Sequence, residues 1–241
     1  MTPVEPPRVV PARGAAGVAA AAAVLAAGGV IALPTDTVYG LAARVDRPRA
    51  LAGIFVAKGR PGDLALPVLV GRWRQVHAVA AEWPRTASML AARFWPGPLT
   101  VVVPSRPEIG TLLGGDGTTV GIRRPAHRFV RSLCAAAGPL AVTSANRHGQ
   151  PPCTSAEEVL AAFSGAVAPG APGARAPDTP GAPGPPAECA GSPPPDGALL
   201  MVVDGGRCDG LPSTVVDCTR PIPRCLREGA VPWAWVEAAV R

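Results

Sequence analysis

Short apolar runs alternate with longer alanine-rich or amphipathic stretches over most of the chain. Val30–Leu33 is a continuous apolar run that stops at Pro34, which is typical of a short buried strand. Residues 15–27 are dense in alanine and are followed by Gly28 and Gly29, a pattern that predicts a helix with a glycine stop. The same reasoning predicts further strands at 66–70, 99–103, 119–123, 139–142, 199–203, 214–217 and 224–227, and further helices at 48–57, 85–94, 126–137, from about 154 onward and at 233–240. Strands that alternate with helices predict an α/β fold built on a mixed sheet with covered faces.

Two segments lack this periodicity. Residues 1–13 are rich in proline and arginine and are expected to be disordered. Residues 164–198 contain 17 Gly or Pro and nine Ala among 35 residues, a composition that cannot offset the entropy of ordering. We interpret this segment as a disordered insert that loops out of one domain spanning 14–241, because strand-like sequence resumes after it. A linker between two domains is the alternative, although the 43 residues that follow are few for an independent core.

The charge balance is basic, with a formal net charge of +6 and a pI near 9.5. Such a charge suits anionic partners such as nucleotides, RNA or acidic lipid, but it also serves simply to keep a protein soluble. The six cysteines form no C-x-x-C pair and no zinc-finger spacing with the three histidines, which indicates reduced thiols in an intracellular protein and no protein metal site. No stretch reaches the roughly 18–20 uncharged apolar residues of a membrane span. We therefore expect a cytoplasmic protein, and Arg8 and Arg13 leave a mitochondrial pool open.

Polar chemistry is concentrated where a predicted strand or helix runs into a loop. The chain holds one lysine, one tyrosine and one asparagine, Lys58, Tyr39 and Asn146, in a sequence dominated by alanine, arginine, glycine and proline. These singletons direct attention to positions where a commoner residue type does not suffice. Residues 34–41 place hydroxyls and a carboxylate directly after a buried strand, which suits ligand recognition and equally suits a turn with a helix cap.

Two further segments carry groups suited to a nucleotide, and a fourth set of weaker signals lies between 203 and 229. Residues 58–61 (K-G-R-P) place an ammonium and a guanidinium two residues apart, which fits an oligophosphate or, alternatively, a basic helix end. The chain contains no G-x-x-x-x-G-K-[ST] sequence, so this segment is not a P-loop. Residues 144–146 (S-A-N) put a hydroxyl and an amide on one side of the chain, where they can hold one ligand together or form an ordinary polar turn.

In their order and spacing, these segments resemble the YrdC/TsaC family of threonylcarbamoyl-AMP synthases. The resemblance covers about residues 14–229 and is interrupted by the insert. Its elements are P-T-D-T-V-Y-G-L (34–41), K-G-R-P (58–61), W-P-G-P-L-T (95–100), V-G-I-R-R-P (120–125), T-S-A-N (143–146) and S-T-V-V-D (213–217). The paired K-x-R and S-x-N signatures are its specific part. The resemblance implies a single twisted mixed β-sheet flanked by helices, with a basic concave active site.

The resemblance also assigns roles, carried over at the positions where the motifs match. The implied threonine-binding groups are Thr35, Arg123, Ser144 and Ser213. The implied ATP-binding groups are Lys58, Arg60, Thr119, Asn146, Thr154 and Arg227. The implied catalytic groups are those of the two signatures, Lys58, Arg60, Ser144 and Asn146. Arg123 suits the substrate carboxylate because a guanidinium can donate two parallel hydrogen bonds to it.

The activity implied is that of a nucleotidyltransferase, an L-threonylcarbamoyladenylate synthase. The amine of L-threonine and bicarbonate give a carbamate, which attacks the α-phosphorus of ATP and expels pyrophosphate. The adenylate then supplies a downstream threonylcarbamoyl transferase complex that modifies tRNA to t6A at position 37. Such a transfer needs positioned reactants and neutralised charge rather than a side-chain nucleophile. Mg²⁺ is expected to arrive with ATP, without dedicated protein ligands.

Three positions depart from the family pattern. Leu64 stands where some members have a nucleotide-contacting asparagine, Leu69 where some have a threonine-contacting histidine, and Glu228 where the usual R-P-G has proline. These departures leave open an inactive family member with a scaffolding role. A double-stranded RNA or tRNA-binding module that uses the same basic concavity is the other alternative, although such a module has no need of Ser144 or Asn146.

Overall fold

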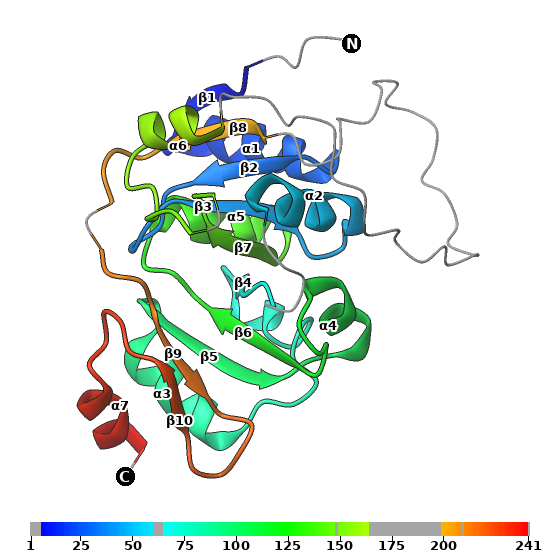
Figure 1. Ribbon diagram of the computed structural model, residues 1–241. Helices are drawn as coiled ribbons and strands as arrows, with labels where there is room; N and C mark the ends of the chain where they lie inside the picture. The colour runs from blue at the N-terminus through cyan, green and yellow to red at the C-terminus, as the bar shows by residue number, and fades with distance from the viewer. Residues whose placement is uncertain (1–5, 60–64, 148, 164–198, 209, 241) are drawn as a thin grey trace.

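One ten-stranded mixed sheet organises the computed structural model, in which neighbouring strands follow the order β1-β8-β2-β3-β7-β4-β6-β5-β9-β10 (Figure 1). The structure describes residues 6–59, 65–147, 149–163, 199–208 and 210–240. The strands are β1 (Arg8–Pro11), β2 (Val30–Leu33), β3 (Gly40–Arg44), β4 (Val68–Leu69), β5 (Leu99–Pro104), β6 (Thr119–Arg123), β7 (Leu140–Ser144), β8 (Leu199–Asp204), β9 (Thr214–Asp217) and β10 (Arg224–Arg227). Parallel and antiparallel pairs alternate irregularly along the sheet, so the fold is a mixed α/β sheet, as predicted.

Helices cover both faces of the sheet. The two helices α1 and α5 pack against each other over one face, and the others contribute to the core on the opposite face (Figure 1). The helices are α1 (Gly14–Ala26), α2 (Pro48–Lys58), α3 (Arg85–Phe94), α4 (Pro107–Leu113), α5 (Arg128–Ala137), α6 (Ala156–Phe163) and α7 (Trp233–Val240), and Trp73–Gln75 form a single 3₁₀ turn. The predicted arrangement of a sheet flanked by helices is therefore confirmed.

Strand β2 contributes side chains to the hydrophobic clusters on both faces of the sheet. Its four residues are all buried, and they alternate between the two hydrophobic clusters. Val30 and Ala32 belong to the larger cluster, whereas Ile31 and Leu33 belong to the cluster under α1 and α5. Successive side chains of a strand point to opposite faces, so an uninterrupted apolar run is the pattern expected for a strand covered on both sides.

Several predicted elements coincide with the observed ones, and the differences have physical reasons. The predicted disorder of residues 1–13 is wrong at Arg8–Pro11, which form β1 and pair in parallel with β8, and residues 1–5 lie outside the described residues. Gly40–Arg44 were not predicted as a strand, since G-L-A-A-R has no alternation and weak strand propensity, yet they form β3. Gly40 is required there because a Cβ would lie 2.6 Å from a side-chain carbon of Val142 on β7. Predicted residues 66–70 give only a two-residue β4, and the short α4 was not predicted.

The segment predicted to be a disordered insert, 164–198, lies outside the described residues. The elements on either side of it, α6 and β8, pack against each other and contribute Val159 and Val202 to the same hydrophobic cluster. Strand β8 then lies between β1 and β2 rather than at the far edge of the sheet. Within the described part of the chain, no helix combines the length and the apolar character that crossing a membrane requires.

Candidate functional site

Six of the residues expected to bind ligands line one cavity of about 450 Å³, which we call the central cavity. Thr35 follows β2, Thr119 and Arg123 are the first and last residues of β6, Ser144 ends β7, Ser213 precedes β9 and Arg227 ends β10. In the order of the sheet these strands extend from β2 through β7 and β6 to β9 and β10, so the residues come from much of the sheet and not from adjacent strands alone. Thr35 and Arg227, which are 192 positions apart in the sequence, therefore line the same cavity.

Lys58 is buried beside this cavity and contacts the segment that carries Ser144 and Asn146. Its Nζ donates to the backbone carbonyl of Ser144 (2.5 Å) and to Oδ1 of Asn146 (2.9 Å), and it lies 3.4 Å from Ser144 Oγ. Helix α2 ends at Lys58 because Gly59 adopts a left-handed conformation with φ of 59°. The lysine side chain thus reaches across to the end of β7. Arg60, the second basic residue of the K-x-R signature, lies outside the described residues, as does Leu64.

Asn146 organises the loop that follows β7. Its Nδ2 donates to the backbone carbonyls of Arg147 (3.0 Å) and Gln150 (2.5 Å), while its Oδ1 accepts the hydrogen bond from Lys58. The amide therefore uses both its donors and its acceptor, and a glutamine one methylene longer could not keep all three bonds in place. This geometry explains why the single asparagine of the chain occurs here.

Arg123 is the most buried charged group of the central cavity, with 6% of its surface exposed. Its Nε donates to the backbone carbonyl of Gly97 (3.1 Å), Nη1 to Thr37 Oγ1 (2.9 Å) and Nη2 to Asp36 Oδ1 (2.5 Å). A guanidinium has five N–H groups, and three of them make these bonds, so two N–H groups are left to bind a ligand. Burial lowers the pKa of Arg123, and the Asp36 carboxylate opposes that effect.

The loop between β2 and β3 supplies two of these contacts. Thr35 Oγ1 accepts hydrogen bonds from the backbone N–H groups of Thr37 (3.1 Å) and Val38 (3.2 Å), which closes a tight turn. The same hydroxyl lies 2.7 Å from the carbonyl of Val38 and 2.8 Å from Thr37 Oγ1. The turn holds Thr37 and Asp36 against Arg123. Sequence reasoning assigned Thr35 but missed Asp36, whose only signal was a carboxylate between two threonines after a buried strand.

Gly97 provides the third contact to Arg123 through a close backbone approach. A Cβ at this position would lie 2.3 Å from the backbone carbonyl oxygen of Phe94, so no larger residue fits without displacement. The N–H of Gly97 in turn donates to the carbonyl of Arg124 (2.9 Å). Trp95 anchors the start of this loop by donating from Nε1 to the carbonyl of Leu99 (2.7 Å). The W-P-G-P motif therefore acts through its backbone on the arginine of the neighbouring strand.

Arg227 and Ser213 meet at another part of the cavity. The guanidinium of Arg227 donates to the backbone carbonyl of Ser213 through Nε (3.2 Å) and Nη2 (2.8 Å), and Nη2 lies 3.3 Å from Ser213 Oγ. Ser213 Oγ also lies 2.9 Å from Thr100 Oγ1. Burial lowers the pKa of Arg227. The neighbouring carboxylate of Glu228 turns away from the cavity and accepts the first N–H of α7, from Trp233 (2.8 Å).

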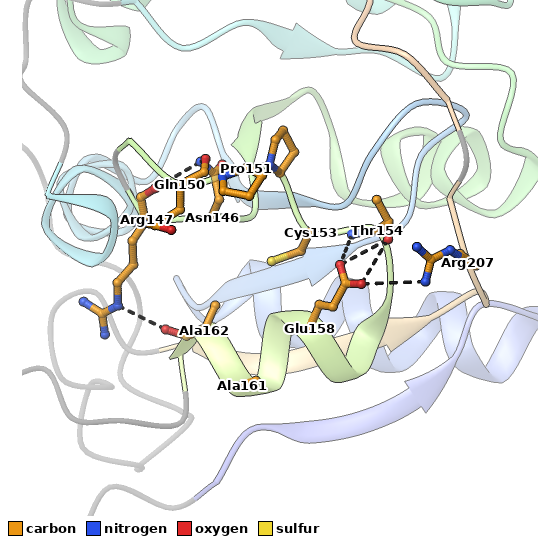
Figure 2. A pocket seen from close by; sticks show the side chains of 11 residues that line it. Asn146, Arg147, Gln150, Pro151, Cys153, Thr154, Glu158, Ala161, Ala162 and Arg207 are labelled. Atoms are coloured by element: carbon orange, nitrogen blue, oxygen red, sulfur yellow. Dashed lines mark hydrogen bonds and ion pairs between the residues drawn. The ribbon is translucent and has the colours of Figure 1, made fainter.

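A second hollow of about 640 Å³, which we call the loop pocket, lies between the loop after β7, helix α6 and Arg207 (Figure 2). Asn146 and Thr154 line it, so the predicted ATP-binding residues are divided between two hollows. The hydroxyl of Thr154 lies 3.1 Å from Glu158 Oε2, and Arg207 forms an ion pair with the same carboxylate at 3.7 Å. Pro152 lines both hollows, which therefore adjoin.

Tyr39, the single tyrosine, and Leu69, which departs from the family pattern, both lie at the central cavity. The Tyr39 hydroxyl donates to the carbonyl of Gly206 (2.8 Å) and accepts the N–H of Gly205 (3.1 Å), so it ties the end of β8 to the loop before β3. Burial raises the pKa of Tyr39 to about 12. Phenylalanine could not make these bonds. Leu69 lines the central cavity and gives it part of an apolar wall.

Metal-binding groups are sparse. In the part of the chain that the structure describes, no three His, Cys, Asp or Glu side chains cluster in a way that could hold a metal ion. The expected arrival of Mg²⁺ with ATP stays a prediction, as does the basic character of the concave site.

Comparison with known proteins places this geometry in context. Residues 23–178 match the Sua5/YciO/YrdC family model, described as telomere recombination. The threonylcarbamoyl-AMP synthase of Pyrococcus abyssi is 35% identical over 222 residues, which are 91% of this chain and 56% of that protein. A putative threonylcarbamoyl-AMP synthase of Mycobacterium tuberculosis is 33% identical over 216 residues, 89% of this chain and 85% of that protein.

The fold comparison agrees. The crystal structure of P. abyssi Sua5 complexed with L-threonine superposes with a TM-score of 0.78 at 33% identity, covering 96% of this chain and 60% of that one. The chain thus spans little more than half the length of the P. abyssi relative. The family model matches more than half of the chain, and the mycobacterial relative is matched over most of its length. The chain belongs to the Sua5/YciO/YrdC family.

Proposed function

We propose that the chain is an L-threonylcarbamoyladenylate synthase, which converts L-threonine, bicarbonate and ATP into threonylcarbamoyl-AMP and pyrophosphate. The observation that carries the proposal is the contact of Lys58 with Ser144 and Asn146, which joins the K-x-R and S-x-N segments beside a cavity lined by Thr35 and Arg123. Relatives that match most of this chain are named threonylcarbamoyl-AMP synthases. The Sua5 structure with L-threonine supports an amino-acid site in the same fold.

The proposed attack requires the carbamate formed on threonine to lie in line with the α-phosphorus of ATP. Two adjoining hollows, one for each reactant, suit this arrangement. In the proposal, threonine occupies the central cavity, with its carboxylate on the two remaining N–H groups of Arg123. ATP spans from the central cavity to the loop pocket, with phosphates near Lys58 and Arg60 and further contacts from Thr119, Asn146, Thr154 and Arg227. Fixed positive charge beside the polyphosphate stabilises the charge that develops as pyrophosphate leaves.

The fate of the product, the metal ion, the RNA contact and the location belong to the same proposal. The adenylate would serve t6A formation at position 37 of tRNA through a downstream threonylcarbamoyl transferase complex. Mg²⁺ bound to ATP would neutralise part of the phosphate charge, and contact with double-stranded RNA or tRNA would draw on the net positive charge of the chain. A cytoplasmic location stays a prediction from the sequence, and a mitochondrial pool stays open.

One incubation tests the activity. Protein is mixed with ATP, Mg²⁺, L-threonine and bicarbonate, and pyrophosphate and the adenylate are measured by enzymatic assay and mass spectrometry. We expect pyrophosphate release only when threonine and bicarbonate are both present, because the attacking carbamate forms from both. Release at the same rate without threonine would indicate an ordinary ATPase. No release, with ligand binding intact, would favour the inactive scaffold or the RNA-binding module.

A further inference from the structure

Two arginines reach the central cavity, and they are held in different ways. Arg123 forms a buried ion pair with Asp36, with an Nη2 to Oδ1 distance of 2.5 Å and side-chain exposures of 8% and 16%. Arg227 donates only to the backbone carbonyl and hydroxyl of Ser213, and among the described residues it contacts no carboxylate. The charge of Arg123 is therefore balanced, whereas that of Arg227 is not.

The carboxylate of Asp36 is placed to act through Arg123 rather than on a ligand. Asp36 does not line the cavity, and its second oxygen, Oδ2, is buried without a hydrogen-bond partner in the described parts of the chain. Among the described residues, the side chain of Asp36 therefore accepts its hydrogen bond from Arg123 through Oδ1. Buried charges are weakly screened, so this carboxylate and the guanidinium act as a nearly neutral unit at their end of the cavity.

A neutral unit and a free cation prefer different ligands. A lone guanidinium binds phosphate about as readily as it binds carboxylate, because both accept two parallel hydrogen bonds. Beside a fixed carboxylate, a polyanion is repelled, whereas a zwitterion with one negative and one positive group is tolerated. Two remaining N–H groups of Arg123 still offer direct bonds to a carboxylate. Discrimination of this kind arises from a built-in repulsion as much as from attraction.

We infer that Asp36 is a specificity-determining positioning residue: by pairing with Arg123, it reserves that end of the cavity for a zwitterionic amino acid and excludes polyphosphate. Arg227, without such a partner, marks the end that takes the phosphates. The inference deepens the proposed function and rests on it for the identity of the amino acid. The exclusion of polyphosphate by Asp36 does not depend on turnover.

Binding measurements separate recognition of the amino acid from exclusion of polyphosphate. Isothermal titration calorimetry on the full chain measures the affinities for L-threonine, for 3-hydroxybutyrate, which lacks the amino group, and for inorganic tripolyphosphate. In Asp36→Asn, we expect the preference for threonine over 3-hydroxybutyrate to fall about tenfold, the scale of one lost charge interaction of one pKa unit. Tripolyphosphate should bind at least about tenfold more tightly than to the wild type and should compete with threonine. Unchanged affinities for all three ligands would overturn the inference.

Two further variants control for charge and geometry. Asp46→Asn removes one carboxylate from a surface ion pair with Arg44 of the same length, 2.5 Å, and should leave all three affinities unchanged. Thr37→Val removes a neutral hydrogen bond to Arg123 and should weaken threonine binding without strengthening tripolyphosphate binding. A gain in tripolyphosphate affinity in either variant would show that Asp36 has no special role.

The folded state of each variant is checked by its melting temperature. If Asp36→Asn does not fold, the double variant with Arg123→Gln removes both charges of the pair. It should lose threonine binding and keep the tripolyphosphate affinity of the wild type. A tenfold fall in tripolyphosphate affinity would mean that Arg123 binds phosphate despite Asp36, which contradicts the inference. If the wild type binds no threonine at all, the proposed function fails, and the tripolyphosphate arm alone decides the role of Asp36.

Discussion

Lys58 and Arg123 are both buried cations at one site, yet the chain holds them by different means. Lys58 reaches two acceptors, the Ser144 carbonyl and Asn146 Oδ1, that lie two residues apart on one segment. Arg123 is held by Asp36 and Thr37 from one loop and by the carbonyl of Gly97 from another. These contacts of Lys58 lie on one segment, whereas those of Arg123 come from two loops.

The difference has consequences for both stability and chemistry. The charge of a cation that is paired with a carboxylate is neutralised locally. Removing the cation leaves the carboxylate charge without a partner inside the protein, which destabilises the folded state. Lys58 donates to a carbonyl and to an amide oxygen, which are neutral acceptors. The Lys58 end therefore suits stabilisation of phosphate charge, whereas the Arg123 end suits recognition of a neutral zwitterion. Variants at each end of the site test this division.

The largest effect is expected at Lys58. Lys58→Ala should lower kcat/KM for ATP by about 100-fold or more, the scale of losing a preorganised charge stabiliser. Stability should change by only about 1 kcal/mol, because the carbonyl and amide acceptors it leaves lie beside hollows that water can enter. Pyrophosphate release measures the first quantity and urea denaturation the second. The Lys58→Arg variant should also have a lowered kcat/KM, since a planar guanidinium does not fit the space that the compact ammonium occupies between Ser144 and Asn146.

Arg93, in the last turn of α3, offers the matched control for Lys58, because both are basic residues at a helix end. Arg93→Ala should cost a few tenths of a kcal/mol, as expected for the loss of a favourable helix-dipole contact, and should leave turnover intact. Normal turnover in Lys58→Ala, in a protein whose wild type makes the adenylate, would show that Lys58 is only such a helix-end residue.

The same contrast explains what could be predicted from the sequence. The S-x-N segment is contiguous, so its spacing indicated that the Ser144 and Asn146 side chains lie close together, and Lys58 stood out as the single lysine. The contact between Lys58 and Asn146 was not predicted. The contacts of Arg123 could not be anticipated, because one is a backbone carbonyl and another depends on a turn that Thr35 Oγ1 closes. Side-chain motifs identify which residues matter, but they do not show which backbone atoms orient them.

The fold follows a similar rule. The bounds of Val30–Leu33 and Thr119–Arg123 were predicted to the residue, because these apolar or β-branched runs end at or just before a proline. Gly40–Arg44 were missed, since their strand state comes from pairing with β2 and β7 and not from local propensity. Arg8–Pro11 pair with residues far along the chain, in β8. Long-range pairing overrides composition at both places.

A smaller effect is expected when the Lys58 end is made to resemble the Arg123 end. Asn146→Asp places a carboxylate 2.9 Å from Lys58 Nζ, in the position of the present amide oxygen. We expect KM for ATP to rise about tenfold, as for one lost pKa unit of charge interaction, with KM for threonine nearly unchanged. Asn146→Ala loses the same donor bonds to the loop without adding a charge. If Ala raises KM for ATP as much as Asp does, loop geometry and not charge controls the phosphate end.

The smallest effect is expected at Glu228, which tests whether the phosphate end is free of interfering negative charge. This residue follows Arg227, but its carboxylate accepts the N–H of Trp233 at the start of α7. Glu228→Ala should therefore act on stability, by about 1 kcal/mol for a lost helix cap, which corresponds to a fall of about 2–4 °C in Tm for a domain of this size. Glu228→Gln keeps an acceptor for the N–H and should lose less. In both variants kcat/KM for ATP should stay within about twofold, because the charge is directed away from the cavity and is screened by solvent. A clear rise in kcat/KM on removing the charge, at unchanged Tm, would mean that Glu228 does weaken phosphate binding through Arg227, and the division between a balanced and an unbalanced arginine would no longer hold.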